Sequence, residues 1–219
     1  RTPINAISGT MELLEHSELQ DYQRNYLKIA KTSLNNLLSM VNNVLDITKI
    51  EAGAMQVELK CFNIYEEIGH ATEIMKNLAL NKDISINLSI DDSIPECLHG
   101  DNIKMMQVYN NLLYNAVKFT QHGKIDIRVS IKEKEEYFLS LLFEILDTGI
   151  GVPEEEKGKL FQRFSQIKGI YSIENKGTGL GLMISKELAE LLGGSIGYRN
   201  NIPVGSIFFF TIPLQYKKK

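Results

Sequence analysis

The spacing of the apolar residues changes once along this chain of 219 residues, and that change constrains the fold more than any single motif. Between Ser17 and Gly53, positions recur at alternating intervals of three and four, which is typical of a helix that packs along one seam. These seam positions are Leu27, Ala30, Leu34, Leu37, Val41, Val44 and Thr48. After Gly53 the apolar residues alternate with a period of two, as in a strand. We therefore predict two domains, residues 1–53 and 54–219.

The first domain is predicted to be an antiparallel pair of helices. Pro3 is tolerated in the first turn of a helix whose apolar face is Ile4, Ile7, Met11 and Leu14. Ser17 and Gln20 form a candidate capping box for the second helix, and Gly53 is expected to end it. The apolar stripes exceed what one hairpin can bury, so we expect a dimeric four-helix bundle. The alternative is a hairpin packed on the second domain of the same chain.

The second domain is predicted to be a mixed sheet covered by helices on one face, which makes the fold class α+β. Asn63 and Glu66 are expected to cap its first helix. Alternating residues predict strands at 55–59, 84–90, 124–131, 137–146, 195–200 and 205–212. Helical patterns cover 63–80 and 101–119 and lie on both sides of the loop 168–179.

Composition argues against several classes of function. The formal charge is -3 and the basic residues are scattered, apart from Lys217–Lys219, so we expect no nucleic acid partner. Cys61 and Cys97 have no CxxC or CxxH spacing, which argues against a disulfide framework or a zinc site and suits a reducing compartment. The apolar runs are shorter than the roughly 18 residues of a membrane span. We expect a cytoplasmic domain whose attachment to any membrane-anchored receptor lies outside these residues.

The stretch NNLLYNAVKFT, residues 110–120, carries the first candidate binding residues. On a helix, Asn111, Asn115 and Lys118 share one face. Asn has poor helix propensity, so two on one face suggest a function. Amide oxygens suit Mg²⁺ and a Lys ammonium suits phosphate. The alternative is an ordinary solvated face.

The stretch DTGIGVP, residues 147–153, directly follows an apolar strand. Gly149 and Gly151 permit positive φ and close approach of the backbone to a ligand. Asp147 can accept a hydrogen bond from an exocyclic amine. The alternative is an ordinary turn, because turns are built from the same residues.

The stretch GTGLGL, residues 177–182, precedes a helical segment. Its glycines, Gly177, Gly179 and Gly181, leave the backbone amides free to bind phosphate at a helix N-terminus, where the dipole favours anions. It lacks the Lys and Ser or Thr of a Walker A loop, and no strand leads directly into it. A mobile hinge is a compatible reading.

Taken in order, with LFQRFSQ at 160–166 and GGSIG at 193–197, these stretches resemble the ATP-binding domain of sensor histidine kinases. Upstream, RTPINAISG and DITKIEAG resemble the dimerisation and phosphoacceptor domain of that family, and hybrid sensor kinases in particular. The resemblance covers essentially the whole chain and implies a two-layer α/β sandwich of the histidine kinase and gyrase type. The chain departs from the pattern at Pro203 and Ile207, where Gly and Ser or Thr are usual.

The resemblance implies a role for each motif residue. Asn115 would coordinate Mg²⁺ that bridges the phosphates of ATP, while Asn111 and Lys118 would support the phosphate site. Asp147 would hold the adenine amine, and Arg163 would approach the phosphate. The positions beside the base and around a lid at about 166–177 would be Gly149, Gly151, Gly177, Thr178, Gly179, Leu180 and Gly181.

The resemblance also places a phosphoacceptor His, followed by the Glu that serves as its base, three residues before the Arg of Arg-Thr-Pro. We therefore expect this His upstream of Arg1, because His16, His70, His99 and His122 all lack that setting. The phosphoryl group would pass from it to an Asp of a response-regulator receiver domain. Thr2 matches the position that orients water in the reverse phosphatase reaction.

Two alternatives stay open. An ATPase of the gyrase, mismatch-repair or chaperone type has this nucleotide fold, but such enzymes use a Glu to activate water where this sequence has Asn111. A non-catalytic dimeric scaffold would keep the helices without binding ATP. The intact DTGIG and GTGLGL stretches argue against the scaffold.

Overall fold

The computed structural model describes residues 2–80, 82–163, 165 and 179–216, with the backbone alone for Thr2, Asn5 and Ser39. Its contacts divide the chain into two compact units, Arg1–Met55 and Gln56–Lys219. Each unit is described by itself.

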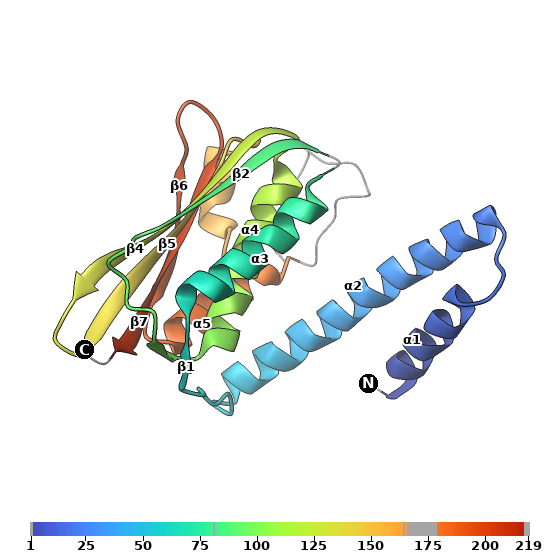
Figure 1. Cartoon of the computed structure of the whole chain (residues 1–219), viewed down its shortest axis with the longest axis horizontal. Coiled ribbons are helices and arrows are strands. Elements are labelled where there is room, and N and C mark those ends of the chain that lie inside the picture. Colours follow the sequence, from blue (N-terminus) through green and yellow to red (C-terminus); the bar gives the residue numbers. More distant parts are fainter. Residues whose placement is uncertain (1, 81, 164, 166–178, 217–219) are drawn as a thin grey trace. The chain divides into compact units, whose positions relative to one another are not determined.

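The first unit is the predicted antiparallel hairpin of α1 (Thr2–Glu15) and α2 (Asp21–Glu51) (Figure 1). The predicted capping box was wrong in its residues. Gln20 caps α2, and its amide donates to Oε1 of Gln23 over 2.9 Å. The Ser17 hydroxyl instead donates to the carbonyl of Leu14 over 2.7 Å, because Ser17 lies too far before α2 and closes the end of α1.

The end of α2 confirms the role predicted for Gly53. Its φ of 63° lies in the left-handed region, which a residue with a Cβ rarely adopts. The Gly53 amide donates to the carbonyl of Ile50, and the Ala54 amide donates to that of Lys49, each over 2.9 Å. This pair of bonds is a Schellman motif, which satisfies carbonyls that the helix leaves without partners.

The apolar seam of α2 is only partly covered within the chain. Leu34 is 7% exposed, whereas Leu37 is 48% exposed and Val44 is 50% exposed. Exposed apolar side chains at seam positions favour a further packing partner.

The second unit contains seven strands within its described residues. They are β1 (Lys60–Phe62), β2 (Asp83–Ile90), β3 (Leu98–Gly100), β4 (His122–Lys134), β5 (Phe138–Asp147), β6 (Ser195–Asn200) and β7 (Ser206–Tyr216). Its helical segments are α3 (Ile64–Leu78), α4 (Asn102–Phe119), the 3₁₀ helix η1 (Glu154–Lys159) and α5 (Gly181–Leu191). No helix in the described part of the chain combines the length and apolar character needed to cross a membrane.

The strands form one mixed sheet in the order β1-β3-β7-β5-β4-β2, with β6 also paired to β7. The β2–β4 pair is parallel and the other pairs are antiparallel. The strand predicted at 55–59 was wrong, because the first strand of the sheet is β1 at 60–62, where Phe62 meets Leu98 across the β3 pairing. Alternation alone could not locate this short pairing.

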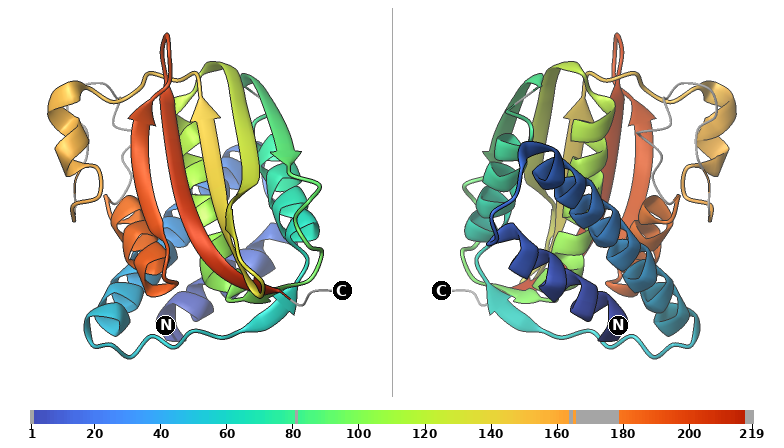
Figure 2. Two further views of the ribbon diagram at one scale, coloured as in Figure 1. Left: turned by 90° about the vertical axis from the view of Figure 1, so that its left-hand side faces the viewer. Right: turned by 90° about the vertical axis from the view of Figure 1, so that its right-hand side faces the viewer.

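Helices α3, α4 and α5 cover one face of the sheet and leave the other open, as predicted (Figure 2). Phe143 of β5 and Phe210 of β7 are fully buried and stack with their ring centroids 4.3 Å apart. The Tyr109 hydroxyl of α4 lies 2.7 Å from Oγ1 of Thr72 on α3, and burial raises the pKa of Tyr109 to about 12. This buried hydrogen bond ties the two helices together within the core.

The two cysteines correct another prediction. Cys61 and Cys97 form a disulfide with their Cα atoms 5.8 Å apart, although their spacing argued against a disulfide framework. They are 36 residues apart in sequence, and pairing of β1 with β3 brings them together. Sequence spacing reports on local motifs, so it could not reveal a contact created by strand pairing.

Candidate functional site

The predicted polar face of α4 forms because the opposite face of the helix is buried. Leu112 and Ala116 are 0% and 2% exposed, whereas Asn111, Asn115 and Lys118 are partly exposed. The helix begins at a side-chain cap: Asp101 accepts the Lys104 amide over 3.0 Å. The buried face therefore fixes the rotation of α4, and the three polar residues share one partly open side.

Lys82 holds the other end of α4, although no sequence motif marked this residue. Its ammonium donates to the carbonyl of Val117 over 2.6 Å and to that of Thr120 over 3.3 Å. A cation at a helix C-terminus satisfies carbonyls that lack intrahelical partners and opposes the negative end of the helix dipole. Lys82 thus holds the turn of α4 that carries Lys118.

Asn111 links α4 to the start of α5. Its Nδ2 donates to Oγ of the buried Ser185 over 2.7 Å. A Cβ added to Gly181 would come within 2.5 Å of Oδ1 of Asn111. Glycine at 181 is therefore required by the approach of this amide, and the middle of α4 lies against the first turn of α5.

Asp147, at the end of β5, is only 3% exposed. Its Oδ1 accepts the amide of Gly149 over 2.8 Å and the amide of Ser206 over 3.2 Å. Burial raises the pKa of Asp147, and the hydrogen bonds from Gly149 and Ser206 oppose that rise. A buried carboxylate held by backbone donors is an oriented acceptor for a ligand N–H group.

The glycines after Asp147 let several backbone segments meet. A Cβ on Gly149 would come within 2.5 Å of the carbonyl oxygen of Phe119, so the end of α4 lies against this turn. Gly151 has a φ of 71°, which favours glycine. The departure from the family pattern at Pro203 and Ile207 lies in the hairpin of β6 and β7, beside the amide of Ser206 that reaches Asp147.

The first turn of α5 presents backbone amides. Gly179 has a φ of 71° and precedes Leu180, whose side chain is 3% exposed. The first turn of α5 contains no acidic side chain, so the positive end of the dipole is not neutralised there. The backbone amides at this helix N-terminus, with glycine at 179 and 181, therefore suit a phosphate.

The remaining predicted residues follow η1 or lie outside the described residues. Arg163 is exposed in the turns that follow η1. Gly177, Thr178 and the lid expected at about 166–177 lie outside the described residues, as does the side chain of Thr2.

Lys118 lies on the same face of α4 as Asn115. Its ammonium is 5.0 Å from the centroid of the Phe119 ring, and partial burial lowers its pKa. A Lys ammonium is a point charge that suits phosphate.

These contacts order the candidate site along one helix. The Asn111 end of the polar face meets the amides of α5, and the Phe119 end meets the turn after Asp147. Asn115 and Lys118 lie between these two ends on α4. The amide oxygen of Asn115 is a hard ligand that suits Mg²⁺. The site therefore offers Asp147 as an acceptor for a base at one end, the amides of α5 for an anion at the other end, and a ligand for a phosphate-bound metal between them.

Residues outside the predicted motifs also support this arrangement. Asn201 Nδ2 donates to the carbonyl of Asp147 over 2.8 Å, and Ser206 supplies a backbone donor to the carboxylate of the same residue. Thr120 follows α4 and is fully buried, and its Oγ1 has no hydrogen-bond partner among the described residues. Thr120 is the last residue of the predicted stretch 110–120, and its position directly after the helix is the signal that could have drawn attention to it.

The four histidines lie in or beside several different elements, and His122, which we expected in a turn, lies in a strand. His16 follows α1, His70 lies in α3, His99 lies in β3 and His122 begins β4. None of the four lies within the segment RTPINAISG, residues 1–9, although His16 directly follows α1, the helix that carries it.

Comparison with known families decides the classification. Residues 100–216 match the model described as histidine kinase-, DNA gyrase B-, and HSP90-like ATPase. This chain belongs to that ATPase family. Residues 1–53 match the His Kinase A (phospho-acceptor) domain. The family match spans α4, Asp147 and α5, which are the elements that build the candidate site.

Curated relatives of this family member are histidine kinases and regulatory proteins. The chain is 40% identical over 215 residues to the sensory/regulatory protein RpfC of Xanthomonas campestris pv. campestris, covering 98% of this chain and 30% of RpfC. It is 37% identical over 213 residues to hybrid signal transduction histidine kinase B of Dictyostelium discoideum, covering 97% and 11%. The chain thus spans less than a third of the length of these relatives.

A solved structure confirms the fold of this family member. Full-length ShkA in complex with AMPPNP gives a TM-score of 0.81 at 30% identity, covering all of this chain and 44% of ShkA. The predicted α+β class is therefore confirmed, with a helical unit followed by a sheet covered by helices.

Proposed function

We propose that the second unit binds ATP between the polar face of α4, the end of β5 and the first turn of α5. The observation that carries this proposal is the buried Asp147, which backbone donors of Gly149 and Ser206 orient at one end of the polar face. Asp147 would accept the exocyclic amine of adenine, with Gly149 and Gly151 beside the base. The crystallised complex of ShkA with AMPPNP supports an adenine nucleotide as the ligand.

The phosphates of ATP would lie toward the first turn of α5. Its backbone amides around Gly179, Leu180 and Gly181 would bind them, with Lys118 as the nearby cation. Asn115 would ligate Mg²⁺, which when bound neutralises charge on the phosphates. Asn111 would act indirectly, since its bond to Ser185 keeps α4 and α5 together.

The reaction that fits this site is phosphoryl transfer to histidine. A His nitrogen would attack the γ-phosphorus in line, the bond to the β-phosphate oxygen would break, and ADP would leave. We propose that this His lies upstream of Arg1 on the helix that carries RTPINAISG. The phosphoryl group would then pass to an Asp of a response-regulator receiver domain. The match to the phospho-acceptor domain supports this order of steps.

The helical unit would act as a homodimer that presents the phosphoacceptor. Leu37 and Val44 leave an apolar seam half exposed on α2, which a second copy of the hairpin would cover. Thr2, in the first turn of α1, would orient water in the reverse phosphatase reaction.

Incubation with γ-labelled ATP tests the proposal. The 219-residue chain should bind ATP without acquiring label, because its four histidines lie outside the phosphoacceptor segment. A longer form with a His restored before Arg1 should acquire an acid-labile, alkali-stable label, and replacement of that His should abolish it.

Three results would contradict this reading. Label on His16, His70, His99 or His122 would show that the phosphoacceptor has been misplaced. Brisk ATP hydrolysis without label would favour a gyrase-like ATPase, which Asn111 disfavours because its amide is not a base and is bonded to Ser185. Absence of ATP binding would favour a non-catalytic scaffold.

A further inference from the structure

Three metal-ligating side chains meet at the β1–β3 ribbon, remote in sequence from the proposed nucleotide site. The sulfur atoms of Cys61 and Cys97 and a ring nitrogen of His99 all lie within 4.8 Å of one another. Nε2 of His99 is 3.8 Å from Sγ of Cys97. The proposed function assigns no role to these three residues.

Strand pairing explains how the three side chains converge. Cys61 lies directly opposite His99 in the antiparallel pair of β1 and β3. Cys97 precedes His99 by two residues, so the two side chains share one face of the extended backbone. All three ligands therefore point to the same side of the ribbon, and neither cysteine is buried.

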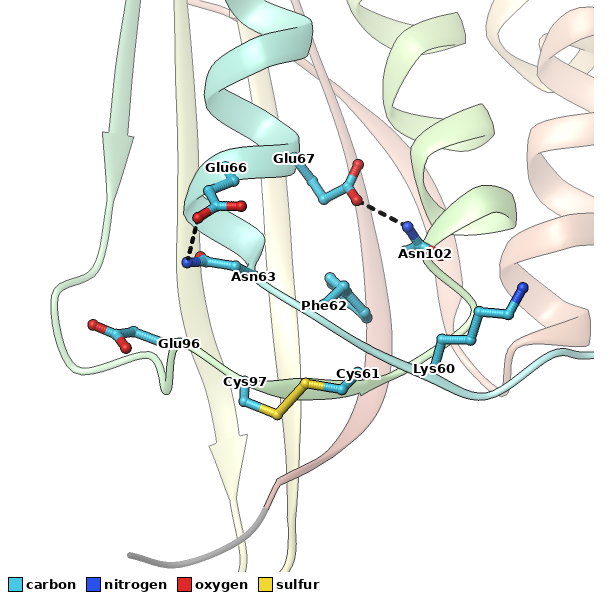
Figure 3. Close-up of a pocket in the computed structure, with 9 residues that line it drawn as sticks. All are labelled: Lys60, Cys61, Phe62, Asn63, Glu66, Glu67, Glu96, Cys97 and Asn102. Atoms are coloured by element: carbon cyan, nitrogen blue, oxygen red, sulfur yellow. Dashed lines mark hydrogen bonds between the residues drawn. A yellow bond between two sulfur atoms is a disulfide. The ribbon is translucent and has the colours of Figure 1, made fainter.

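The surroundings of the cysteines favour a cation. Cys61 and Cys97 line a hollow of about 480 Å³ together with Glu66, Glu67 and Glu96. The Glu67 carboxylate accepts a hydrogen bond from Asn102 over 2.9 Å on the side of the hollow formed by α3 and α4 (Figure 3). Lys60 also lines the hollow, so its charged side chains are three carboxylates and one ammonium, and their net negative charge favours a cation.

We propose that Cys61, Cys97 and His99 form a binding site for a Zn²⁺-like cation when the disulfide is reduced. Two thiolates and one imidazole are preferred ligands of Zn²⁺, and a three-residue set leaves the fourth tetrahedral position to solvent. The disulfide of the structure is the metal-free alternative state of the same residues.

The disulfide and the metal-bound dithiol interconvert by reduction and oxidation with two classes of reagent. A phosphine and one water reduce the disulfide to two thiols, and the phosphine leaves as its oxide. Binding of the cation then displaces one proton from each thiol. In the opposite direction, a two-electron oxidant such as a diazene takes both thiol hydrogens and restores the disulfide after the metal leaves.

This site would control how firmly the first strand is held. β1 is three residues long and pairs with β3, which contacts β7 through two register pairs. A bridge between Cys61 and Cys97, whether a disulfide or a metal, restrains the segment that leads into α3. The dithiol form without metal lacks any such bridge.

Titration with Co²⁺, a spectroscopic substitute for Zn²⁺, tests the proposal. The 219-residue chain is reduced with a phosphine, freed of reductant without air and titrated. We expect one equivalent of Co²⁺ to give a thiolate-to-metal charge-transfer absorption and intense tetrahedral d–d bands, which Zn²⁺ then removes by displacement. A chain treated with a diazene oxidant should give neither signal.

Variants assign the ligands. Cys61→Ser removes one of the two thiolates and should reduce the charge-transfer absorption by about half or more. His99→Ala should weaken Co²⁺ binding by at least about tenfold, because loss of even an outer-sphere partner of a metal ligand has that effect. His122→Ala is the matched control, since His122 is an exposed histidine outside the cluster, and should leave binding unchanged. Circular dichroism of each variant verifies the fold.

Three results would overturn the proposal. A reduced chain that gives no charge-transfer absorption has no thiolate site. An oxidised chain that binds Co²⁺ as tightly as the reduced chain uses other ligands. Equal affinity of His99→Ala and His122→Ala would exclude His99 from the site.

Discussion

The Nδ2 of Asn111 donates a 2.7 Å hydrogen bond to the Oγ of Ser185, and this bond joins the middle of α4 to α5. The Oδ1 atom of the same amide lies 2.5 Å from the position that a Cβ of residue 181 would take. One side chain thus determines both the separation of the two helices and the residue type at the start of α5. The phosphate site that we propose depends on this arrangement.

Replacement of Gly181 by Ala should disturb that arrangement. The new Cβ would come within 2.5 Å of Oδ1 of Asn111 and displace the amide from Ser185. Overpacking costs about 1–3 kcal/mol, and we expect ATP affinity to fall by about tenfold in calorimetry. Gly158→Ala is the control, because its Cβ would meet nothing within 4 Å. Equal affinities of the two variants would contradict the proposed role of the α4–α5 contact.

Asp147→Asn should weaken ATP binding by roughly 10- to 100-fold, because a hydrogen bond to a charged group contributes about 1.5–3 kcal/mol. Asp92→Asn, at an exposed aspartate, should leave affinity unchanged. Retention of parental affinity by Asp147→Asn would exclude this residue as the adenine acceptor.

The pH dependence of binding provides a separate test of Asp147. Burial raises the pKa of its carboxyl above the ordinary 3.8, so protonation begins at a higher pH than for an exposed aspartate. The protonated carboxyl is a weaker acceptor, and ATP affinity should therefore fall as the pH decreases through the raised pKa. Titrations across the acidic range should show that Asp147→Asn lacks this component. A profile that is the same in both proteins would assign the titration to another group.

Asn115→Ala should remove the stimulation of nucleotide binding by Mg²⁺, because it deletes the proposed amide ligand on the polar face of α4. Calorimetry with and without the metal measures this difference. Asn87→Ala, which removes a surface amide on β2, should keep the Mg²⁺ dependence of the parent. Undiminished stimulation in Asn115→Ala would place the metal on other ligands.

Leu37→Glu should convert a dimer of the chain into a monomer, as measured by analytical ultracentrifugation. Leu37 is a seam residue that is 48% exposed within one chain. A glutamate at this position would place a buried charge in the dimer, which opposes association, whereas in the monomer the charge stays in water. Leu34 is a poorer choice, since it is 7% exposed and a charge would destabilise the fold itself. Leu80→Glu in the second unit is the control. A parent chain that stays monomeric at high micromolar concentration would refute the proposed dimer.

Regular patterns in the sequence predicted much of the fold. The long helix α2, the cap at Asn63 and the stop at Gly53 depend on neighbours within a few residues, and the structure bears each of them out. The polar face of α4 was likewise predictable, because the 3.6-residue period places Asn111 and Asn115 together.

Contacts between distant segments could not be predicted in this way. Lys82 donates to the carbonyl of Val117, which is 35 residues away in sequence, and Cys61 is 36 residues from Cys97. Only the folded sheet makes these residues neighbours. Asn201 approaches Asp147 for the same reason. Each of these contacts depends on strand order, which periodicity does not encode.

Strand β7 pairs with β3, β5 and β6 in the finished sheet, yet the chain reaches it only after the six other described strands have been made. While synthesis proceeds from the N-terminus, β5 has a bare edge and Phe143 lacks the ring of Phe210 on which it stacks. Such an intermediate exposes apolar surface to other nascent chains. The sheet can therefore be completed only in a late step, when residues 206–216 have left the ribosome and β7 pairs with its neighbours. Chaperone contact before that step would protect the growing protein.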